Sequence, residues 1–158
     1  MYPSGWPDAV QIDDLKLRYT SDVQLILRGL CSASSASSTA SWVGVVGAAL
    51  DGPSQDALIR AVDERRISGV ALMVLANRLS EQALGMELTA AAMLAGGVLG
   101  SWFQIAAWAA GKGMRIVGME AHELLAVCYS VQVDQCKEQP DLARLNRKIF
   151  GSSHPWGR

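Results

Sequence analysis

The sequence lacks the patterns on which most enzyme chemistry depends. It contains two histidines, no GxSxG nucleophile elbow, and no glycine-rich phosphate loop behind a predicted strand. His122 and Glu123 are neighbours and point in different directions on a helix, so they make neither a metal pair nor a catalytic pair. His154 lies in a polar tail. We therefore expect a protein that is not an enzyme and that binds no metal and no cofactor.

An excess of charge of either sign is also missing. The chain has 14 basic and 15 acidic residues, which give a formal net charge of −1. Its basic residues are scattered, apart from Arg65-Arg66 and the loose set Arg144, Arg147 and Lys148. Proteins that bind nucleic acid usually carry a basic face for the phosphates. The balance of charge therefore predicts no nucleic-acid partner.

Cysteine is sparse and forms no motif. Cys31, Cys128 and Cys136 include no CxxC pair, and their number is odd. This usage favours reduced, buried thiols in a cytoplasmic protein. The N-terminal stretch MYPSGWPDAVQIDD is acidic and lacks the apolar segment of a secretory signal. We expect a cytoplasmic location.

The chain does contain abundant apolar surface at helical spacing. Half of its 158 residues are hydrophobic, enough for one buried core. Ser54 and Ser68 are suited to cap helices, and Gly85 and Gly151 are suited to end them. This pattern predicts an all-α fold, a compact bundle of five to six helices. The expected helices span residues 42–50, 54–66, 68–84, 88–111, 119–136 and 141–150. In the helix expected over residues 68–84, the residues expected to be buried are Val70, Leu72, Met73, Leu75, Ala76 and Leu79.

The remaining segments divide the chain further. Apolar residues alternate with polar ones from Val10 to Tyr19, which predicts an extended arm or a short hairpin within an N-terminal arm, residues 1–31. Ser21 is suited to cap a helix over residues 22–30 within this arm. We expect the arm to dock on the body or on a neighbouring molecule. The composition of residues 32–41, SASSASSTAS, predicts a flexible serine-rich linker or a weakly held loop. Residues 42–151 form the expected bundle domain, and residues 152–158 form a flexible tail.

A run of 24 residues, Leu88–Gly111, contains no charged side chain. As one helix it is long enough to cross a bilayer, and a small membrane protein anchored by residues 88–111 is one alternative. Gln104 within the run, the off-centre Trp102 and Trp108, and the amphipathic neighbouring helices favour a buried bundle helix instead. We expect the core position and no membrane contact.

Three glycines are the most specific feature of this run. Gly96, Gly97 and Gly100 leave room for a neighbouring helix to approach closely. Together with Trp102 and Trp108 they predict a helix-packing groove, which is filled by a helix of the same bundle or by a helix of a partner protein.

Three tryptophans outside the run are candidate anchors for a partner. Trp6 and Trp156 lie in terminal segments too short to form a core of their own, and Trp42 begins the helical body. Tryptophans often anchor protein interfaces. The alternative is that they pack back onto the bundle, and the sequence leaves both interpretations open.

A family resemblance begins at Gly85. The stretches GMELTAAAMLAGGVLGSWFQIAAWAAGKGM, HELLAVCYSVQVDQC and DLARLNRKIFG follow one another in the chain. In this order they resemble small helical proteins from the tail-gene clusters of phages that infect actinobacteria, which are treated as tail assembly chaperones. The resemblance covers about Leu72–Gly151. It includes a helix with the pattern hxLLAxxY, which runs from His122 to Tyr129 in this chain.

The resemblance implies a non-enzymatic role in virion assembly. A chaperone of this kind shields the apolar stripes of a long helical tape-measure protein and recruits tail-tube subunits, so its partners are other phage proteins in the host cytoplasm. One alternative is a structural virion component, such as a head–tail connector or a capsid accessory, which would be found in the virion. The sequence leaves the oligomeric state open.

Overall fold

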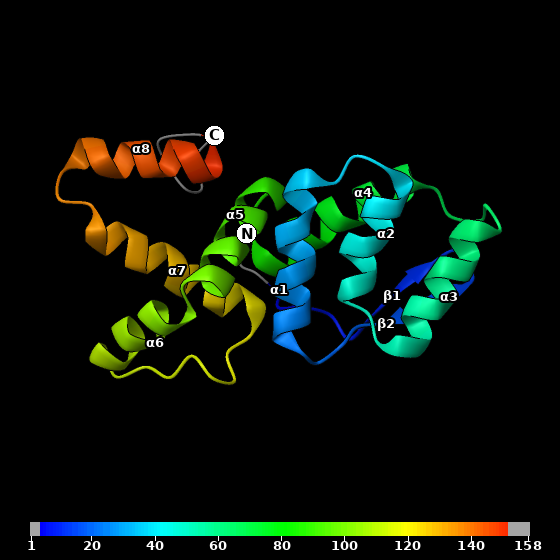
Figure 1. The fold of residues 1–158 in the computed structure, drawn as a ribbon, viewed down its shortest axis with the longest axis horizontal. Coiled ribbons are helices and arrows are strands. Elements are labelled where there is room, and N and C mark those ends of the chain that lie inside the picture. The colour runs from blue at the N-terminus through cyan, green and yellow to red at the C-terminus, as the bar shows by residue number, and fades with distance from the viewer. Residues whose placement is uncertain (1–3, 152–158) are drawn as a thin grey trace.

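Residues 4–151 are described by a computed structural model, and they form a mostly helical fold with one small hairpin (Figure 1). The expected helical fold with an N-terminal hairpin is confirmed. These residues contain eight α-helices, however, because a helix of the expected arm joins the bundle and one expected helix is divided in two. The elements are β1 (Ala9–Ile12), β2 (Leu15–Arg18), α1 (Val23–Ser32), a 3-10 turn (Ala33–Ser35), α2 (Thr39–Ala48), α3 (Gly52–Asp63), α4 (Gly69–Leu79), a π-helical turn (Ser80–Leu84), α5 (Leu88–Gly100), α6 (Trp102–Gly111), α7 (Ala121–Gln135) and α8 (Gln139–Phe150).

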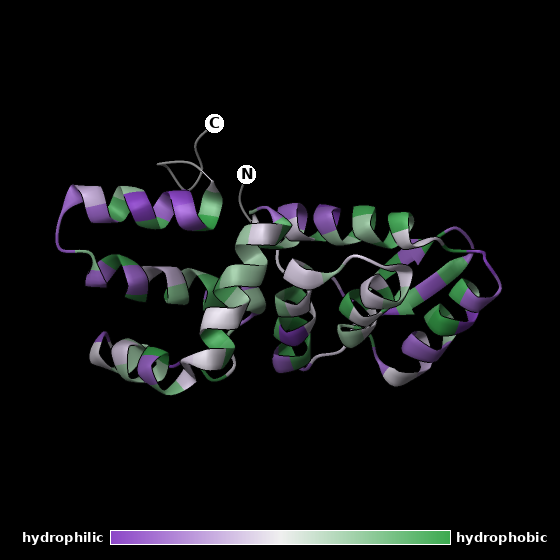
Figure 2. Cartoon of the chain, turned by 45° about the horizontal axis from the view of Figure 1, so that its top comes forward, coloured by the Kyte–Doolittle hydropathy of each residue, from purple (hydrophilic) through white to green (hydrophobic). Residues whose placement is uncertain are grey.

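Helix α5 lies in the middle of the molecule. It packs against α1, α7 and α8, and its Leu94, Ala95 and Val98 are fully buried. The hairpin and α3 lie at one end, while α6, α7 and α8 lie side by side at the other (Figures 1 and 2). A mostly apolar helix can be buried on several sides at once. The core position expected for the charge-free run is therefore the position of α5, which contains residues 88–100 of that run.

The expected N-terminal arm packs into the body. Strands β1 and β2 pair antiparallel, with Val10 opposite Leu17. The Arg18 N–H donates to the Ser54 hydroxyl over 2.8 Å, which joins β2 to α3. Helix α1 buries Ile26, Leu27 and Leu30 in the same core that contains the helices of residues 42–151. The arm and the expected bundle domain therefore share one core, which corrects their description as separate units.

The serine-rich segment 32–41 is helical over most of its length, and the linker prediction is wrong for it. The hydroxyls of Ser32 and Ser34 donate to the Gly29 and Cys31 carbonyls at the end of α1. The Ser38 hydroxyl then accepts from the Ser41 N–H and caps the start of α2. Serine hydroxyls can satisfy the backbone groups that helix ends leave open, so a serine-rich stretch can order two helix ends.

The charge-free run is two helices rather than one. Ser101, with φ −133° and ψ 31°, separates α5 from α6. The turn allows α6 to bury Ile105 and Ala109 against the bundle, whereas a straight continuation would carry them away from it. The prediction of one helix over 88–111 is wrong, because Gly100 and Ser101, residue types that commonly end and start helices, were interpreted as part of a continuous helix.

Within residues 4–151, no single helix has both the length and the apolar composition needed to cross a membrane. One bent pair, residues 69–84 with Leu88–Gly100, meets the criteria by length and composition, with 69° between its two parts.

Helix α4 exposes two residues that were expected inside. Ser68 caps it and Gly85, at φ 72°, follows the π-helical turn after it, as expected. Four of the six expected positions are buried, namely Leu72, Leu75, Ala76 and Leu79. Val70 and Met73 instead face solvent. A helix that packs mainly on one neighbour, here α2, buries one side only, and α4 has more apolar residues than that side holds.

Candidate protein-binding faces

The three glycines of the predicted groove have different surroundings. A Cβ atom on Gly96 would lie 3.4 Å from Cys31 Sγ of α1, and one on Gly97 would lie 2.8 Å from Cys128 Sγ of α7. Nothing lies within 4 Å of a Cβ placed on Gly100. The structure therefore brings helices of the same chain against Gly96 and Gly97, while Gly100 faces open space.

The two tryptophans of the predicted groove hold α6 on the body. Trp108 Nε1 donates to Asp134 Oδ2 of α7 over 2.7 Å. Lys112 Nζ lies 3.9 Å from the same oxygen and 5.6 Å from the centroid of the Trp108 ring. Trp102 is half-buried and packs against the core. Neither side chain lines an open groove.

The predicted partner anchors also pack inward where the structure describes them. Trp6 and Trp42 are half-buried against the core. The Trp6 ring meets the Tyr19 ring edge-on, with centroids 5.4 Å apart and an angle of 75° between the planes. Trp156 and the tail 152–158 lie outside the described residues.

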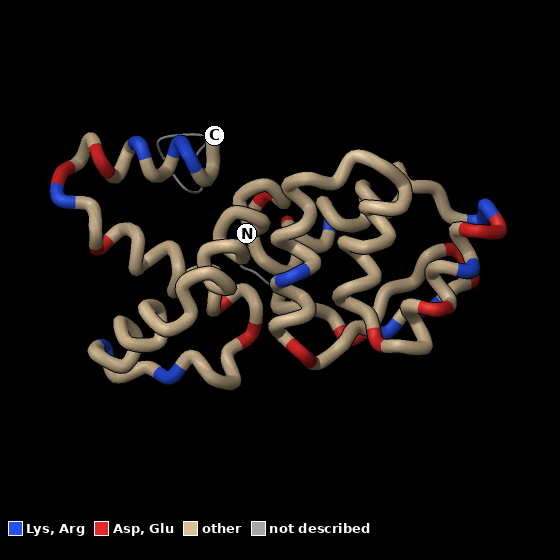
Figure 3. Tube along the Cα trace, viewed as in Figure 1, with Lys and Arg blue, Asp and Glu red and all other residues tan. Residues whose placement is uncertain are grey.

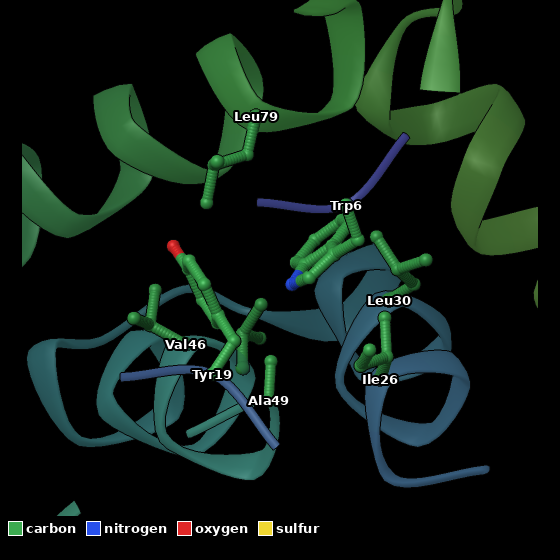
Figure 4. A pocket seen from close by; sticks show the side chains of 8 residues that line it. Trp6, Tyr19, Ile26, Leu30, Val46, Ala49 and Leu79 are labelled. Atoms are coloured by element: carbon green, nitrogen blue, oxygen red, sulfur yellow. The ribbon is translucent and has the colours of Figure 1, made fainter. Parts of the chain in front are cut away.

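A small cavity lies beside Trp6 and Tyr19. Its volume is about 20 Å³, and Figure 4 shows side chains of α1, α2 and α4 around it. Its walls are apolar, and the Tyr19 hydroxyl has no hydrogen-bond partner among the described residues. Burial raises the pKa of the Tyr19 phenol. A space of this size holds about one water molecule, which is too little for a cofactor or an organic substrate.

His122 lies near a carboxylate without forming a metal cluster. Its Nδ1 is 3.3 Å from Glu120 Oε2. Glu123 turns away from His122 and accepts from the Glu120 N–H at the start of α7. Within residues 4–151, no group of three His, Cys, Asp or Glu side chains is placed to hold a metal ion.

The cysteines are separate free thiols. Cys128 is buried, and burial raises the pKa of its thiol, an effect that the hydrogen bond from Gln132 partly offsets. A raised pKa keeps the thiol protonated and therefore a poor nucleophile. Cys128 fills space between α5 and α7.

Among the exposed large hydrophobic residues of the described part of the chain, which also include Ile59, Met93 and Val117, those on α4 and α6 define two apolar surfaces. The first, which we call the α4 face, consists of Val70, Met73 and Val74, exposed by 66%, 37% and 46%. The second, the α6 face, consists of Phe103, exposed by 84%, with the exposed alanines Ala107 and Ala110. Sequence reasoning missed both faces. The available signal was the surplus of apolar residues on α4 and α6 beyond one buried side.

The α6 face lies in an uncharged part of the molecule, whereas the α4 face begins four residues after Arg66. Figure 3 shows Lys, Arg, Asp and Glu gathered around the hairpin and α3 and along α8, whereas α5 and α6 carry none until Lys112. In Figure 2, α6 is pale to green over most of its length. The features of the described residues thus define a helical protein with apolar contact faces. No protein-family model, curated protein or solved structure matches the chain.

Proposed function

We propose that this chain is a non-enzymatic protein-binding factor whose α4 face receives an apolar helix of another protein. The observation that carries the proposal is the exposed stripe of Val70, Met73 and Val74. Their spacing of three and four residues places them on one side of α4. One helix presents such a stripe to another when the two pack together.

The other side of α4 keeps this stripe in a fixed position. Leu72, Leu75 and Leu79 are buried, and α4 packs against α2. The Ser68 hydroxyl accepts from the Ala71 N–H over 3.1 Å and orders the first turn. A partner helix would therefore meet an ordered surface and would pay little to organise it.

In its finer form, the proposal is a phage tail assembly chaperone that shields the apolar stripe of a helical tape-measure protein. The resemblance over Leu72–Gly151 supports this form, and so does the exposed apolar face on a helical body. The partner is then a phage structural protein in the host cytoplasm, and binding requires no cofactor.

Co-expression with the long helical protein encoded beside the gene of this chain tests the proposal. We expect the two proteins to co-purify, and the long protein to stay soluble only in the presence of this chain. In a Val70→Ser/Met73→Ser variant, the loss of roughly 1 kcal/mol of apolar contact at each position lowers the affinity at least tenfold.

Ile59→Ser is the matched control, because Ile59 is 43% exposed but lies on α3. Binding that survives Val70→Ser/Met73→Ser unchanged would overturn the role of the α4 face. The absence of any long helical protein among the neighbouring genes would overturn the chaperone form. Recovery of the chain from purified particles would instead support a structural virion component.

A further inference from the structure

Residues 4–7, which we call the N-terminal strap, cross from the π-helical turn after α4 to the start of α7. The Ser4 N–H and the Ser4 hydroxyl both donate to the Gln82 carbonyl of that turn, over 3.1 and 3.0 Å. A Cβ atom placed on Gly5 would lie 2.7 Å from Glu120 Oε2, at the first turn of α7. The strap therefore lies against two parts of the body that are distant in the sequence.

Trp6 is the part of the strap that reaches the core. Its ring meets Tyr19 edge-on, and in Figure 4 it lies between Tyr19 and Leu30. The side chains that surround it form an apolar seat, which includes Tyr19, Ile26, Leu30, Val46 and Leu79. All five are buried with Trp6 in this position. The strap thus closes over apolar side chains that come from β2, α1, α2 and α4 or follow them directly.

The strap is attached more loosely than the helices below it are packed. Ser4 and Gln82 are both exposed, so water can replace the hydrogen bonds between them. The Trp6 Nε1 atom is buried without a hydrogen-bond partner among the described residues, and a cavity of about 20 Å³ lies beside its ring. Exposed hydrogen bonds and incomplete packing lower the free energy that is needed to open a segment locally.

We propose that the N-terminal strap is a lid that opens by itself and uncovers the apolar seat, while the rest of the fold stays closed. The hairpin sets the limit of this opening, because the Tyr19 N–H donates to the Asp8 carbonyl over 2.9 Å directly after the strap. Gly5 provides the bend of the closed strap, since its φ of 80° lies in the region that glycine adopts most readily. The lid does not depend on the α4 face or on the proposed function.

Thiol labelling of the folded protein tests the lid. Val46→Cys places a thiol in the seat, and Val98→Cys places one in α5, outside the seat. Peptide mass spectrometry separates both positions from Cys31, Cys128 and Cys136. Relative to the rates in the unfolded chain, we expect position 46 to react at least tenfold faster than position 98. Low urea concentrations should change the rate at position 46 little, because the strap exposes little surface when it opens, and should raise the rate at position 98 steeply.

Two glycine substitutions separate opening of the strap from unfolding of the whole chain. Gly5→Ala strains the closed strap, so it should speed labelling at position 46 at least fivefold. Gly118→Ala is the matched control, because Gly118 has φ 88° and a Cβ there meets nothing within 4 Å. It strains the fold outside the strap, so it should speed labelling at position 98, which requires unfolding, and leave position 46 unchanged.

Three results would overturn the proposal: equal labelling at positions 46 and 98, a rate at position 46 that Gly5→Ala does not change, or equal acceleration of position 46 by Gly5→Ala and Gly118→Ala. The last result would show that the seat is reached only by unfolding of the whole chain.

Discussion

A Cβ atom placed on Gly97 would lie 2.8 Å from the Sγ atom of Cys128, closer than real side-chain contacts allow. Helices α5 and α7 therefore approach each other through a bare glycine on one side and a thiol on the other. Cys128 is buried and accepts a hydrogen bond from Gln132 Nε2 over 3.5 Å, so it has little room to move away.

Gly97→Ala should destabilise the protein by about 1–3 kcal/mol, because the added methyl group overpacks the contact with Cys128. Gly100→Ala is the matched control: its Cβ meets nothing, so the gain in helix propensity should stabilise the protein by up to about 1 kcal/mol. Urea unfolding measures both. Cys128→Ala should recover part of the loss in the Gly97→Ala background, and strictly additive effects would contradict the coupling of the two positions.

Arg65→Gly should stabilise the protein by about 0.5–1 kcal/mol. Arg65 follows α3 at φ 58°, the left-handed region that favours glycine. The Arg66 N–H bonds to the Ala61 carbonyl and the Arg65 N–H to the Val62 carbonyl, the pattern of a helix end built around glycine. Thermal unfolding provides the measurement.

Arg66→Gly is the control for this change. Arg66 has no positive φ, and its side chain pairs with Glu64 and Asp14. Replacement there removes contacts without relieving strain, so it should not raise the melting temperature. Equal stabilisation by both substitutions would show that the backbone conformation of Arg65 is not the cause.

Trp108→Phe should loosen α6 on α7 while leaving the rest of the fold intact. The substitution keeps an aromatic ring and removes the 2.7 Å hydrogen bond to Asp134, which contributes about 1 kcal/mol at an exposed position. Hydrogen exchange should become faster in the amides of α6 and stay unchanged in those of α1. Asp134→Asn weakens the same bond and should reproduce the effect to a lesser degree, whereas Trp102→Phe should not.

Tyr19→Phe should be neutral or slightly stabilising at pH 7, because the buried hydroxyl has no hydrogen-bond partner among the described residues. Tyr129→Phe provides the contrast. The Tyr129 hydroxyl donates to Asn146 Oδ1 over 2.6 Å, so its removal should cost about 1 kcal/mol. Equal losses for the two variants would contradict this difference between the two hydroxyls.

The same two tyrosines make stability fall at alkaline pH. Burial raises the pKa of Tyr19 above its ordinary value of roughly 10, and it raises the pKa of Tyr129 as well. Above about pH 10 the unfolded chain releases phenolic protons that the folded chain keeps, so stability decreases as pH rises. The free energy of unfolding of Tyr19→Phe should decline less steeply there than that of the native chain.

Local signals in the sequence identified several helix ends correctly. Ser68 accepts from the Ala71 N–H, and Gly85 and Gly151 adopt φ 72°. The expected cap at Ser54 is the exception, because Asp51 caps α3 instead. These residues act within a few positions of themselves, so a single sequence is enough to interpret them.

Features that depend on distant packing were missed. Gly100 and Ser101 could have marked a break in the charge-free run, but the direction in which α6 turns depends on the burial of Ile105 and Ala109 against the bundle, which no local residue indicates. Val70 and Met73 match the apolar pattern of α4 as well as their buried neighbours do, and only the position of α2 decides which side is covered. Periodicity shows that a helix has apolar positions but not how many neighbours it has.

The packing of α1 against α5 has a consequence for synthesis on the ribosome. Helix α1 ends at Ser32, but its partner begins at Leu88. While the intervening residues are made, Ile26, Leu27 and Leu30 lack the helix that later covers them. A chain that stalls before α5 emerges therefore exposes the side of α1 that α2 does not cover, and this apolar side is available to chaperones and proteases.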